Sequence, residues 1–139
     1  MILVIDASVI IKWLFQDPER EADTEQATAL MAAVARGDMN VVQPPHWLIE
    51  VAAVIARETP ERAQRDLALL EAMTLPVRGD VEVLTRACTL AIDLGHHLFD
   101  TLYHAVALES GACLVTADHR YHRKAEGLPG IRHLRDWDG

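Results

Sequence analysis

The stretch Ile2-Leu3-Val4-Ile5-Asp6 opens the chain with a short apolar run, rich in β-branched residues, and ends on an acid. A run of this kind predicts a strand buried on both faces, as in a parallel sheet. Asp6 would then lie at the carboxyl end of that strand. Because ligands bind beyond the carboxyl ends of the strands in open parallel sheets, Asp6 is the first candidate site residue.

The rest of the chain alternates between strand-like and helix-like segments. Further strands are predicted at residues 41–42, 75–77, 112–115 and 131–134. Helices are predicted at about residues 8–15, 22–36, 45–58, 59–73, 80–94 and 100–110, with a weak helix after residue 118. Strands that alternate with helices predict an α/β fold, in which helices cover both faces of a parallel sheet.

Glycines and prolines mark the predicted ends of the helices. Gly37, Gly95 and Gly111 are placed to end helices, because glycine readily adopts the left-handed conformation common at that position. Pro45 is expected at the first helical position of residues 45–58. The segment Asp17-Pro18-Glu19 marks a break after the first helix.

Length and composition indicate one soluble domain that spans residues 1–139. The chain opens without a basic leader, and charged residues interrupt every apolar run, so we expect a cytoplasmic protein without a membrane span. Cys88 and Cys113 lack partners at metal-ligand spacing. We expect both to be small, buried core residues in a reducing compartment.

The formal net charge of −8 argues at first sight against a nucleic-acid partner. The charge is unevenly distributed, since residues 1–118 hold 8 Lys and Arg against 18 Asp and Glu, whereas residues 119–139 hold 5 against 3. Arg120, Arg123 and Lys124 are candidates for phosphate contacts, although a charged stretch is more often a solvated face. Divalent cations bound to some of the acids would neutralise part of the negative charge.

Three further acids have settings that suggest a shared site with Asp6. Asp118 follows the predicted strand 112–115, Glu50 lies in an apolar helix that we expect to be largely buried, and Asp100 lies in the first turn of another apolar helix. A buried carboxylate needs a partner, because an unpaired buried charge costs several kcal/mol or is neutralised by a shifted pKa. If these acids converge, their oxygens suit a hard divalent cation such as Mg²⁺ or Mn²⁺.

Each acid also has a simpler structural explanation. Asp6 and Asp100 could cap helices, and Asp118 could be a turn residue or a cap. Glu50 could form a buried salt bridge with an arginine.

The seven histidines suggest a zinc site or histidine acid–base catalysis as another possibility. No pair has the His-Glu-x-x-His pattern of zinc peptidases, and His96-His97 has the pattern of a loop. We therefore expect surface or supporting roles for the histidines. His104, one helical turn after Asp100, is expected to lie beside the site.

The acids occur in segments that resemble the motifs of one family. Val4-Ile5-Asp6-Ala7-Ser8-Val9 is similar to the opening motif of PIN-domain nucleases, in particular the VapC-type toxins of bacterial toxin–antitoxin pairs. The segments at residues 45–52, 99–107 and 114–118 resemble the second, third and fourth motifs. Each motif is short, but together they follow the family's order and approximate spacing along the whole chain.

The resemblance implies a compact three-layer α/β/α PIN-like domain with a central, mostly parallel sheet, and the activity of a Mg²⁺- or Mn²⁺-dependent endoribonuclease. It implies that Asp6, Glu50 and Asp100 are the core metal-binding and catalytic acids, and that Asp118 is the family's more variable fourth. Products would carry 5′-phosphate and 3′-hydroxyl ends, so water and not the ribose 2′-OH would be the nucleophile. A homodimer and a small antitoxin partner are also implied.

The hydroxyl residues near the acids are expected to support them. Ser8 matches the hydroxyl residue of the opening motif, and Thr116 precedes Asp118 by two positions. The chain departs from the family at Thr101, where alanine is more usual, and at Arg120, where some relatives carry an acid or amide. The second departure puts the occupancy of a second metal in doubt.

Two other classes of function remain as alternatives. A phosphatase of the haloacid-dehalogenase type also begins with an Asp after its first strand, but that motif requires a second Asp where this chain has Ser8. A non-catalytic PIN-fold module that binds a protein partner is the other alternative. Retention of all four acids speaks against that module.

Overall fold

The computed structural model describes residues 1–17, 19 and 21–138. Pro18, within the predicted break, and Gly139, at the end of the predicted domain, lie outside the described residues.

The strands form one parallel sheet. The described strands are β1 (Ile2–Ile5), β2 (Asn40–Val41), β3 (Cys113–Thr116) and β4 (Ile131–His133). Their order in the sheet is β2-β1-β3-β4, and every neighbouring pair is parallel. The prediction of a parallel sheet is confirmed, and the ends of these four strands differ from the predicted ones by at most one residue.

The helices follow the predicted positions closely. They are α1 (Ala7–Leu14), α2 (Thr24–Ala35), α3 (Trp47–Glu58), η1 (Pro60–Arg62), α4 (Ala63–Ala72), α5 (Val81–Leu94), α6 (Leu98–Ser110), α7 (His119–Lys124) and η2 (Leu134–Asp136). Gly95 and Gly111 cap α5 and α6 at positive φ, and Gly37, also at positive φ, follows the C-cap of α2. The three glycines were therefore predicted correctly.

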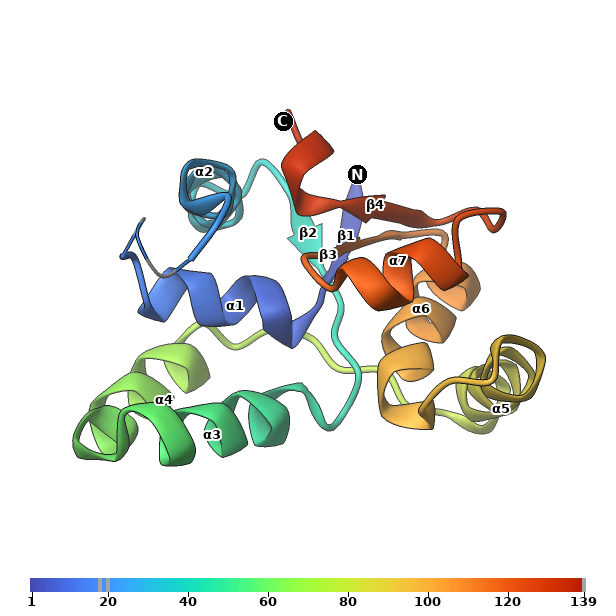
Figure 1. The fold of residues 1–139 in the computed structure, drawn as a ribbon, viewed down its shortest axis with the longest axis horizontal. Helices are drawn as coiled ribbons and strands as arrows, with labels where there is room; N and C mark the ends of the chain where they lie inside the picture. Colours follow the sequence, from blue (N-terminus) through green and yellow to red (C-terminus); the bar gives the residue numbers. More distant parts are fainter. Residues whose placement is uncertain (18, 20, 139) are drawn as a thin grey trace.

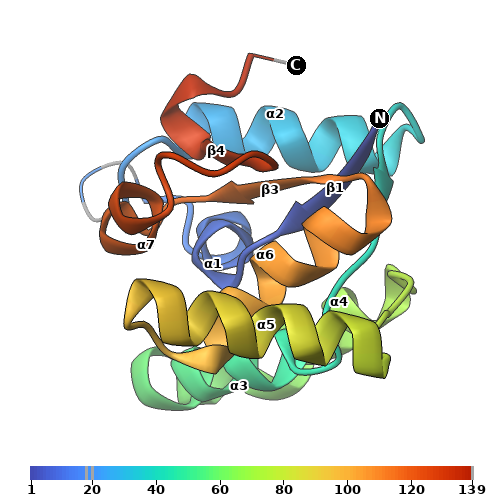
Figure 2. The same cartoon turned by 90° about the vertical axis from the view of Figure 1, so that its right-hand side faces the viewer.

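Helices cover both faces of the sheet, which confirms the three-layer α/β/α architecture. Figure 1 shows the strands at the centre, with α1 and α3 on one side and α5 and α6 on another. In Figure 2 the sheet lies between α2 above and α1 with α6 below, while α3 and α5 form an outer tier. None of the helices that the structure describes has the length and apolarity needed to traverse a lipid bilayer.

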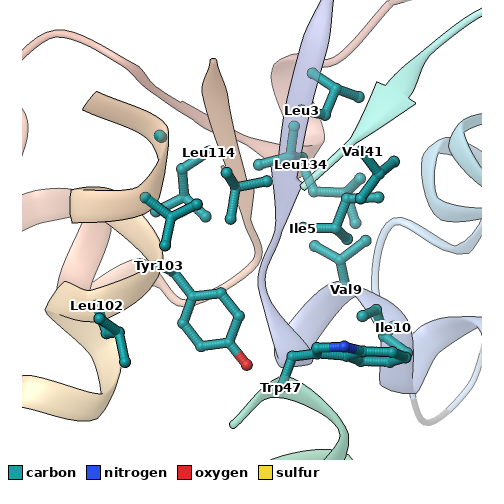
Figure 3. Packing of buried hydrophobic residues seen from close by; sticks show 14 of the residues in the cluster. Leu3, Ile5, Val9, Ile10, Val41, Trp47, Leu102, Tyr103, Leu114 and Leu134 are labelled. Atoms are coloured by element: carbon teal, nitrogen blue, oxygen red, sulfur yellow. The ribbon is translucent and has the colours of Figure 1, made fainter. Parts of the chain in front are cut away.

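The core lies where the central strands meet the inner helices. Leu3, Val4 and Ile5 of β1 are at most 1% exposed, and Figure 3 shows β1 between side chains from α1 and α6. Helix α1 contributes Val9 and Ile10 to this core. Because β1 is buried on both faces, its apolar run could be read as a central strand.

Four local predictions were wrong. Helix α3 begins at Trp47, two residues after Pro45, because residues 45–46 form a turn. Residues 75–77 form only an isolated parallel bridge, between Val77 and Gln43. Helix α3 is half-buried, with Ile49 71% exposed. Cys88 is exposed, since α5 buries its opposite face through Val83, Ala87 and Leu90.

Gln43 completes the pairing of β1 where the short strand β2 has ended. Its side-chain oxygen accepts a hydrogen bond from the Ile5 N–H at 2.8 Å, and its side-chain nitrogen donates to the Ile5 carbonyl at 2.8 Å. The Gln43 side chain is fully buried. It therefore satisfies both main-chain groups of the residue directly before Asp6, groups that burial would otherwise leave unpaired.

Replacing Gln43 with leucine should destabilise the fold strongly. Gln43→Leu keeps the side-chain volume but leaves the Ile5 N–H and carbonyl buried without partners, at about 1–3 kcal/mol for each group. We expect the free energy of unfolding to fall by about 2–4 kcal/mol, measured by urea denaturation followed by circular dichroism. The control Gln16→Leu changes an exposed glutamine and should cost less than about 1 kcal/mol; equal losses for the two variants would contradict this role of Gln43.

Candidate active site

The four predicted acids approach one another from different parts of the fold. Asp6 lies between β1 and α1, and Asp118 lies between β3 and α7. Since β1 and β3 are parallel neighbours, their carboxyl ends lie at the same edge of the sheet. Glu50 and Asp100 lie in the first turns of α3 and α6.

The carboxylate of Asp6 is held by hydroxyl groups from both strand ends. Ser8 donates to Asp6 Oδ2 from its hydroxyl and, at 3.2 Å, from its backbone N–H. The Thr116 hydroxyl donates to the same oxygen at 3.4 Å and accepts from the Asp118 N–H at 3.0 Å. Ser8 Oγ also accepts from the Ala117 N–H at 3.0 Å. Ser8 and Thr116 therefore join the two strand ends through Asp6.

Capping explains part of the arrangement but not all of it. Asp6 caps α1, and Asp118 Oδ1 caps α7 by accepting from the Arg120 and Tyr121 N–H groups at 3.0 and 3.2 Å. Each acid uses one oxygen in its cap, so the second oxygen is available to a ligand. Asp100 is the third residue of α6, where His97 is the N-cap, so capping does not explain Asp100.

Glu50 is paired with a histidine and not with an arginine. His46 Nε2 lies 3.2 Å from Glu50 Oε1 and donates to the Phe99 carbonyl at 2.8 Å. Within the described part of the chain, no Lys or Arg forms an ion pair with Glu50. Desolvation lowers the pKa of His46, but the Glu50 carboxylate, the Phe99 carbonyl and the charge of Asp6 together outweigh it, and the net pKa is raised.

Asp100 has the same kind of partner. His96 Nε2 lies 2.7 Å from Asp100 Oδ2, and the His96 side chain is only 2% exposed. The ligand atoms of His96, Asp100 and Asp118 all lie within 4.8 Å of one another. These three residues are the one group in the described ranges with the spacing of a metal site.

Sequence reasoning missed the roles of His46 and His96. Each histidine precedes an acid by four residues, which is the spacing that brings side chains together along a helix. The repeated spacing could have indicated that each histidine pairs with an acid. It was obscured because both histidines lie before the first helical residue.

The other predicted supporting and RNA-binding residues are His104, Arg120, Arg123 and Lys124, and within the described part of the chain none of their side chains forms a hydrogen bond with a carboxylate of the cluster. His104 is buried and bonds to the Tyr121 hydroxyl at 2.9 Å and the Pro129 carbonyl at 2.8 Å, so its hydrogen bonds do not reach an acid. Arg120 and Arg123 are exposed on α7. Lys124 donates to the Gly95 carbonyl at 2.9 Å and so fastens α7 to the loop that carries His96.

The electrostatics of the site are those of crowded carboxylates. Desolvation, opposed by the hydrogen bonds from Ser8 and reinforced by the charges of Asp100 and Glu50, raises the pKa of Asp6 to about 7. Desolvation and the charges of Asp6 and Glu50 also raise the pKa of Tyr103. In Figure 3 the Tyr103 ring lies beside the end of β1 with its hydroxyl turned toward the start of α1. Asp6, Asp100 and Glu50 therefore act on one another electrostatically.

The donor set fits a divalent cation. It consists of carboxylate oxygens with one imidazole nitrogen, and these groups are ordinary ligands of divalent metals. Burial, and to a smaller extent the charges of Asp100 and Glu50, raise the pKa of Asp6, so a positive charge placed beside it would be stabilising. A bound cation would supply that charge, and Asp6, Glu50, Asp100 and Asp118 are the residues available to hold it.

Comparisons with known proteins agree with the fold. The family model described as PIN domain matches residues 3–127. No curated protein matches the sequence.

Solved structures share the fold at low sequence identity. A toxin–antitoxin complex from Klebsiella pneumoniae contains a chain 18% identical to this one, with TM-score 0.67, over 95% of this chain and 97% of that chain. VapBC2 from Rickettsia felis, bound to a DNA fragment from its promoter, matches at 15% identity and TM-score 0.68 over 99% and 100% of the two chains. VapBC-1 from Haemophilus influenzae matches at 17% identity and TM-score 0.64, over 98% of this chain and 100% of that chain.

Removing the charge of Asp6 should stabilise the metal-free protein at alkaline pH. The pKa of Asp6 is about 7 in the fold against 3.8 as its ordinary value, so the folded state binds more protons between these values, and stability falls as pH rises through them. Asp6→Asn keeps the cap and removes this loss. We expect the free energy of unfolding of the variant to equal that of the native protein near pH 4. At pH 8 it should be larger by about 1–3 kcal/mol.

Thermal unfolding in chelator-treated buffer across pH 4 to 8 measures this difference. Asp93→Asn, which changes an exposed acid of α5, should show no comparable pH-dependent gain. A destabilised Asp6→Asn at pH 8 would show that the Asp6 charge is already compensated within the fold.

Proposed function

We propose that this chain, which belongs to the PIN domain family, is a divalent-metal-dependent endoribonuclease that acts in the cytoplasm as the toxin of a type II toxin–antitoxin system. One observation carries the proposal: parallel strands β1 and β3 bring Asp6 and Asp118 to one edge of the sheet, where α3 and α6 add Glu50 and Asp100.

The four acids are the proposed ligands of the cation, and Ser8 holds one of them in place. Asp6, Glu50, Asp100 and Asp118 would hold Mg²⁺ or Mn²⁺, directly or through water. The chemistry that such a cation would supply is polarisation of the scissile phosphate and a lowered pKa of water. Ser8 orients Asp6 through the hydrogen bonds that its hydroxyl and N–H donate.

Charge determines how an RNA strand can approach this protein. With a net charge of −8, the chain repels phosphates unless cations neutralise its acids. Arg120 and Arg123, exposed on α7 next to Asp118, are suited to bind flanking phosphates. Lys124 is engaged by the Gly95 carbonyl, so its contribution to RNA binding is expected to be smaller. Attack by water on phosphorus, with the bond to the 3′-oxygen broken and that oxygen protonated as it leaves, would give the 5′-phosphate and 3′-hydroxyl ends that the family resemblance implies.

The toxin role is supported by likeness of fold. Three of the similar solved structures are described as toxin–antitoxin or VapBC complexes, and each matches nearly the whole of both chains. We propose that this chain likewise has a cognate antitoxin and forms a homodimer. A short reading frame for a DNA-binding antitoxin immediately upstream of the coding sequence would support this role.

Ser8 separates the nuclease from the phosphatase alternative. A haloacid-dehalogenase-like enzyme requires a second Asp at this position, where the present chain has a hydroxyl that donates to Asp6. The hydroxyl also accepts from the Ala117 N–H at 3.0 Å, a bond that joins α1 to the end of β3. This use of Ser8 favours the nuclease.

Cleavage of RNA should depend on metal and on the clustered acids. We expect a labelled RNA to be cleaved with Mg²⁺ or Mn²⁺ and to remain intact with EDTA. Asp6→Asn and Asp100→Asn should each lower kcat at least about 100-fold, because each removes charge from the proposed cation site. The products are measured by gel electrophoresis and by their end groups.

The exposed acid Asp93 supplies the matched control, since Asp93→Asn should cleave at the native rate. Hydrolysis of a small phosphomonoester without RNA cleavage would identify the phosphatase instead. A folded, metal-loaded protein that is inert toward both substrates would leave only the non-catalytic binding module.

Divalent metal should also stabilise the fold. Because the carboxylates repel one another, a cation that binds only the folded state raises the melting temperature. We expect a clear rise at millimolar Mg²⁺ or Mn²⁺ at pH 8 and a smaller one at pH 6, where Asp6, with its pKa of about 7, is largely protonated. Differential scanning fluorimetry measures both, and an unchanged melting temperature at pH 8 would speak against a shared metal site.

A further inference from the structure

His96 is a buried imidazole within the carboxylate cluster. The proposed function assigns a role to each of the four acids but none to His96. Its side chain is 2% exposed, and one of its ring nitrogens lies within 4.8 Å of ligand oxygens of both Asp100 and Asp118. The three residues come from the loop after α5, from α6 and from the N-cap of α7. Their ligand atoms therefore lie close enough together to bind one ion.

The hydrogen bonds of His96 engage only one of its two ring nitrogens. At the 2.7 Å contact a carboxylate oxygen can only accept, so in the metal-free protein His96 Nε2 carries the hydrogen that bonds to Asp100 Oδ2. Nδ1 is buried and has no hydrogen-bond partner among the described residues. Since nothing described fixes Nδ1, the ring can carry its hydrogen there instead, and Nε2 then offers a lone pair beside Asp100.

The distances suit a shared ion. Two ligands at right angles around a metal, each about 2.1 Å from it, lie about 3 Å apart. The 2.7 Å between His96 Nε2 and Asp100 Oδ2 is close to that separation. A cation bound to both atoms would take the place of the hydrogen along the Nε2 lone pair, with the Asp100 carboxylate turned aside to bind it from a second direction.

The surroundings hold the His96 ring in place. The Tyr121 ring packs against it edge-on, with the ring centres 5.0 Å apart. Lys124 fastens the preceding residue, Gly95, to α7 through its 2.9 Å hydrogen bond. Helix α7 thus positions two of the three residues. It carries Asp118 at its N-cap, and it holds His96 through Tyr121 and Lys124.

We propose that His96 is a nitrogen ligand of the divalent cation, together with Asp100 and Asp118, and that it makes the site prefer Mn²⁺ to Mg²⁺. Mg²⁺ is a hard ion that selects oxygen ligands, whereas imidazole ligands favour transition ions. The inference rests on the proposed function only in that the acidic cluster binds a divalent cation.

His46 is the competing source of nitrogen and is less suited to the role. Its Nε2 donates to the Phe99 carbonyl at 2.8 Å, and this acceptor, unlike the Asp100 carboxylate, is not a candidate ligand that a cation would draw away from the hydrogen. His46 is also outside the group whose ligand atoms lie within 4.8 Å of one another.

Electron spin echo envelope modulation of the Mn²⁺-loaded full chain tests the ligand directly. We expect the ¹⁴N modulation of a bound imidazole in the native protein, altered when the histidines are labelled with ¹⁵N. The modulation should disappear in His96→Gln, which retains an N–H donor for Asp100 but has no imidazole. It should persist in His46→Gln and in His97→Gln, a change at the exposed neighbouring histidine.

Calorimetric titration with each metal tests the selectivity. His96→Gln should weaken Mn²⁺ binding at least about tenfold while Mg²⁺ affinity changes less than about threefold. An equal loss for the two ions would overturn the proposal, because it would mean that His96 only positions Asp100. Bound Mn²⁺ without nitrogen modulation, or modulation lost only in His46→Gln, would also overturn it.

These results separate the two proposals. Mn²⁺ that binds without a nitrogen ligand refutes the role of His96 and leaves the ribonuclease intact. Failure of the native protein to bind either ion refutes the metal-dependent ribonuclease itself.

Discussion

The structure of the site depends on the parallel pairing of β1 with β3. This pairing ends both strands at one edge of the sheet and brings Thr116 to Asp6 across 110 residues of sequence. The hydrogen bonds of Ser8 then tie the end of β3 to the first turn of α1. Because β1 is buried on both sides, its register cannot shift without exposing apolar side chains, so the position of Asp6 is set by the core.

The same arrangement works against stability. Desolvation and the neighbouring acids raise the pKa of Asp6 to about 7, which means that the fold holds this charge at a cost. Proteins commonly retain such unfavourable groups where function requires them. The histidines beside Glu50 and Asp100 relieve part of the crowding, because an imidazole N–H donated to a carboxylate stabilises its charge.

Structural and functional explanations coexist at two of the acids. Asp6 and Asp118 cap α1 and α7, as simple sequence reasoning allows for any acid after a strand. Each cap uses one carboxylate oxygen and aims the side chain along the edge where the other acids converge. Capping in this fold is thus the means by which these acids are oriented.

The sequence alone determined the fold class, the glycine-capped helix ends and the positions of the four acids along their elements. Those features depend on local periodicity, on backbone conformation at glycine and on residue order, all of which can be read from neighbouring residues. The half-exposed face of α3 and the exposure of Cys88 could not be read, since an apolar segment does not show which of its sides the rest of the chain covers.

Only the tertiary structure decided which side chains act on the acids. Gln43 bonds to Ile5 from 38 residues away, and His96 meets Asp118 through the packing of α7. Such partners are chosen by distances between elements, which no local pattern encodes, because a polar side chain takes whichever partner the packed core places within about 3 Å of it.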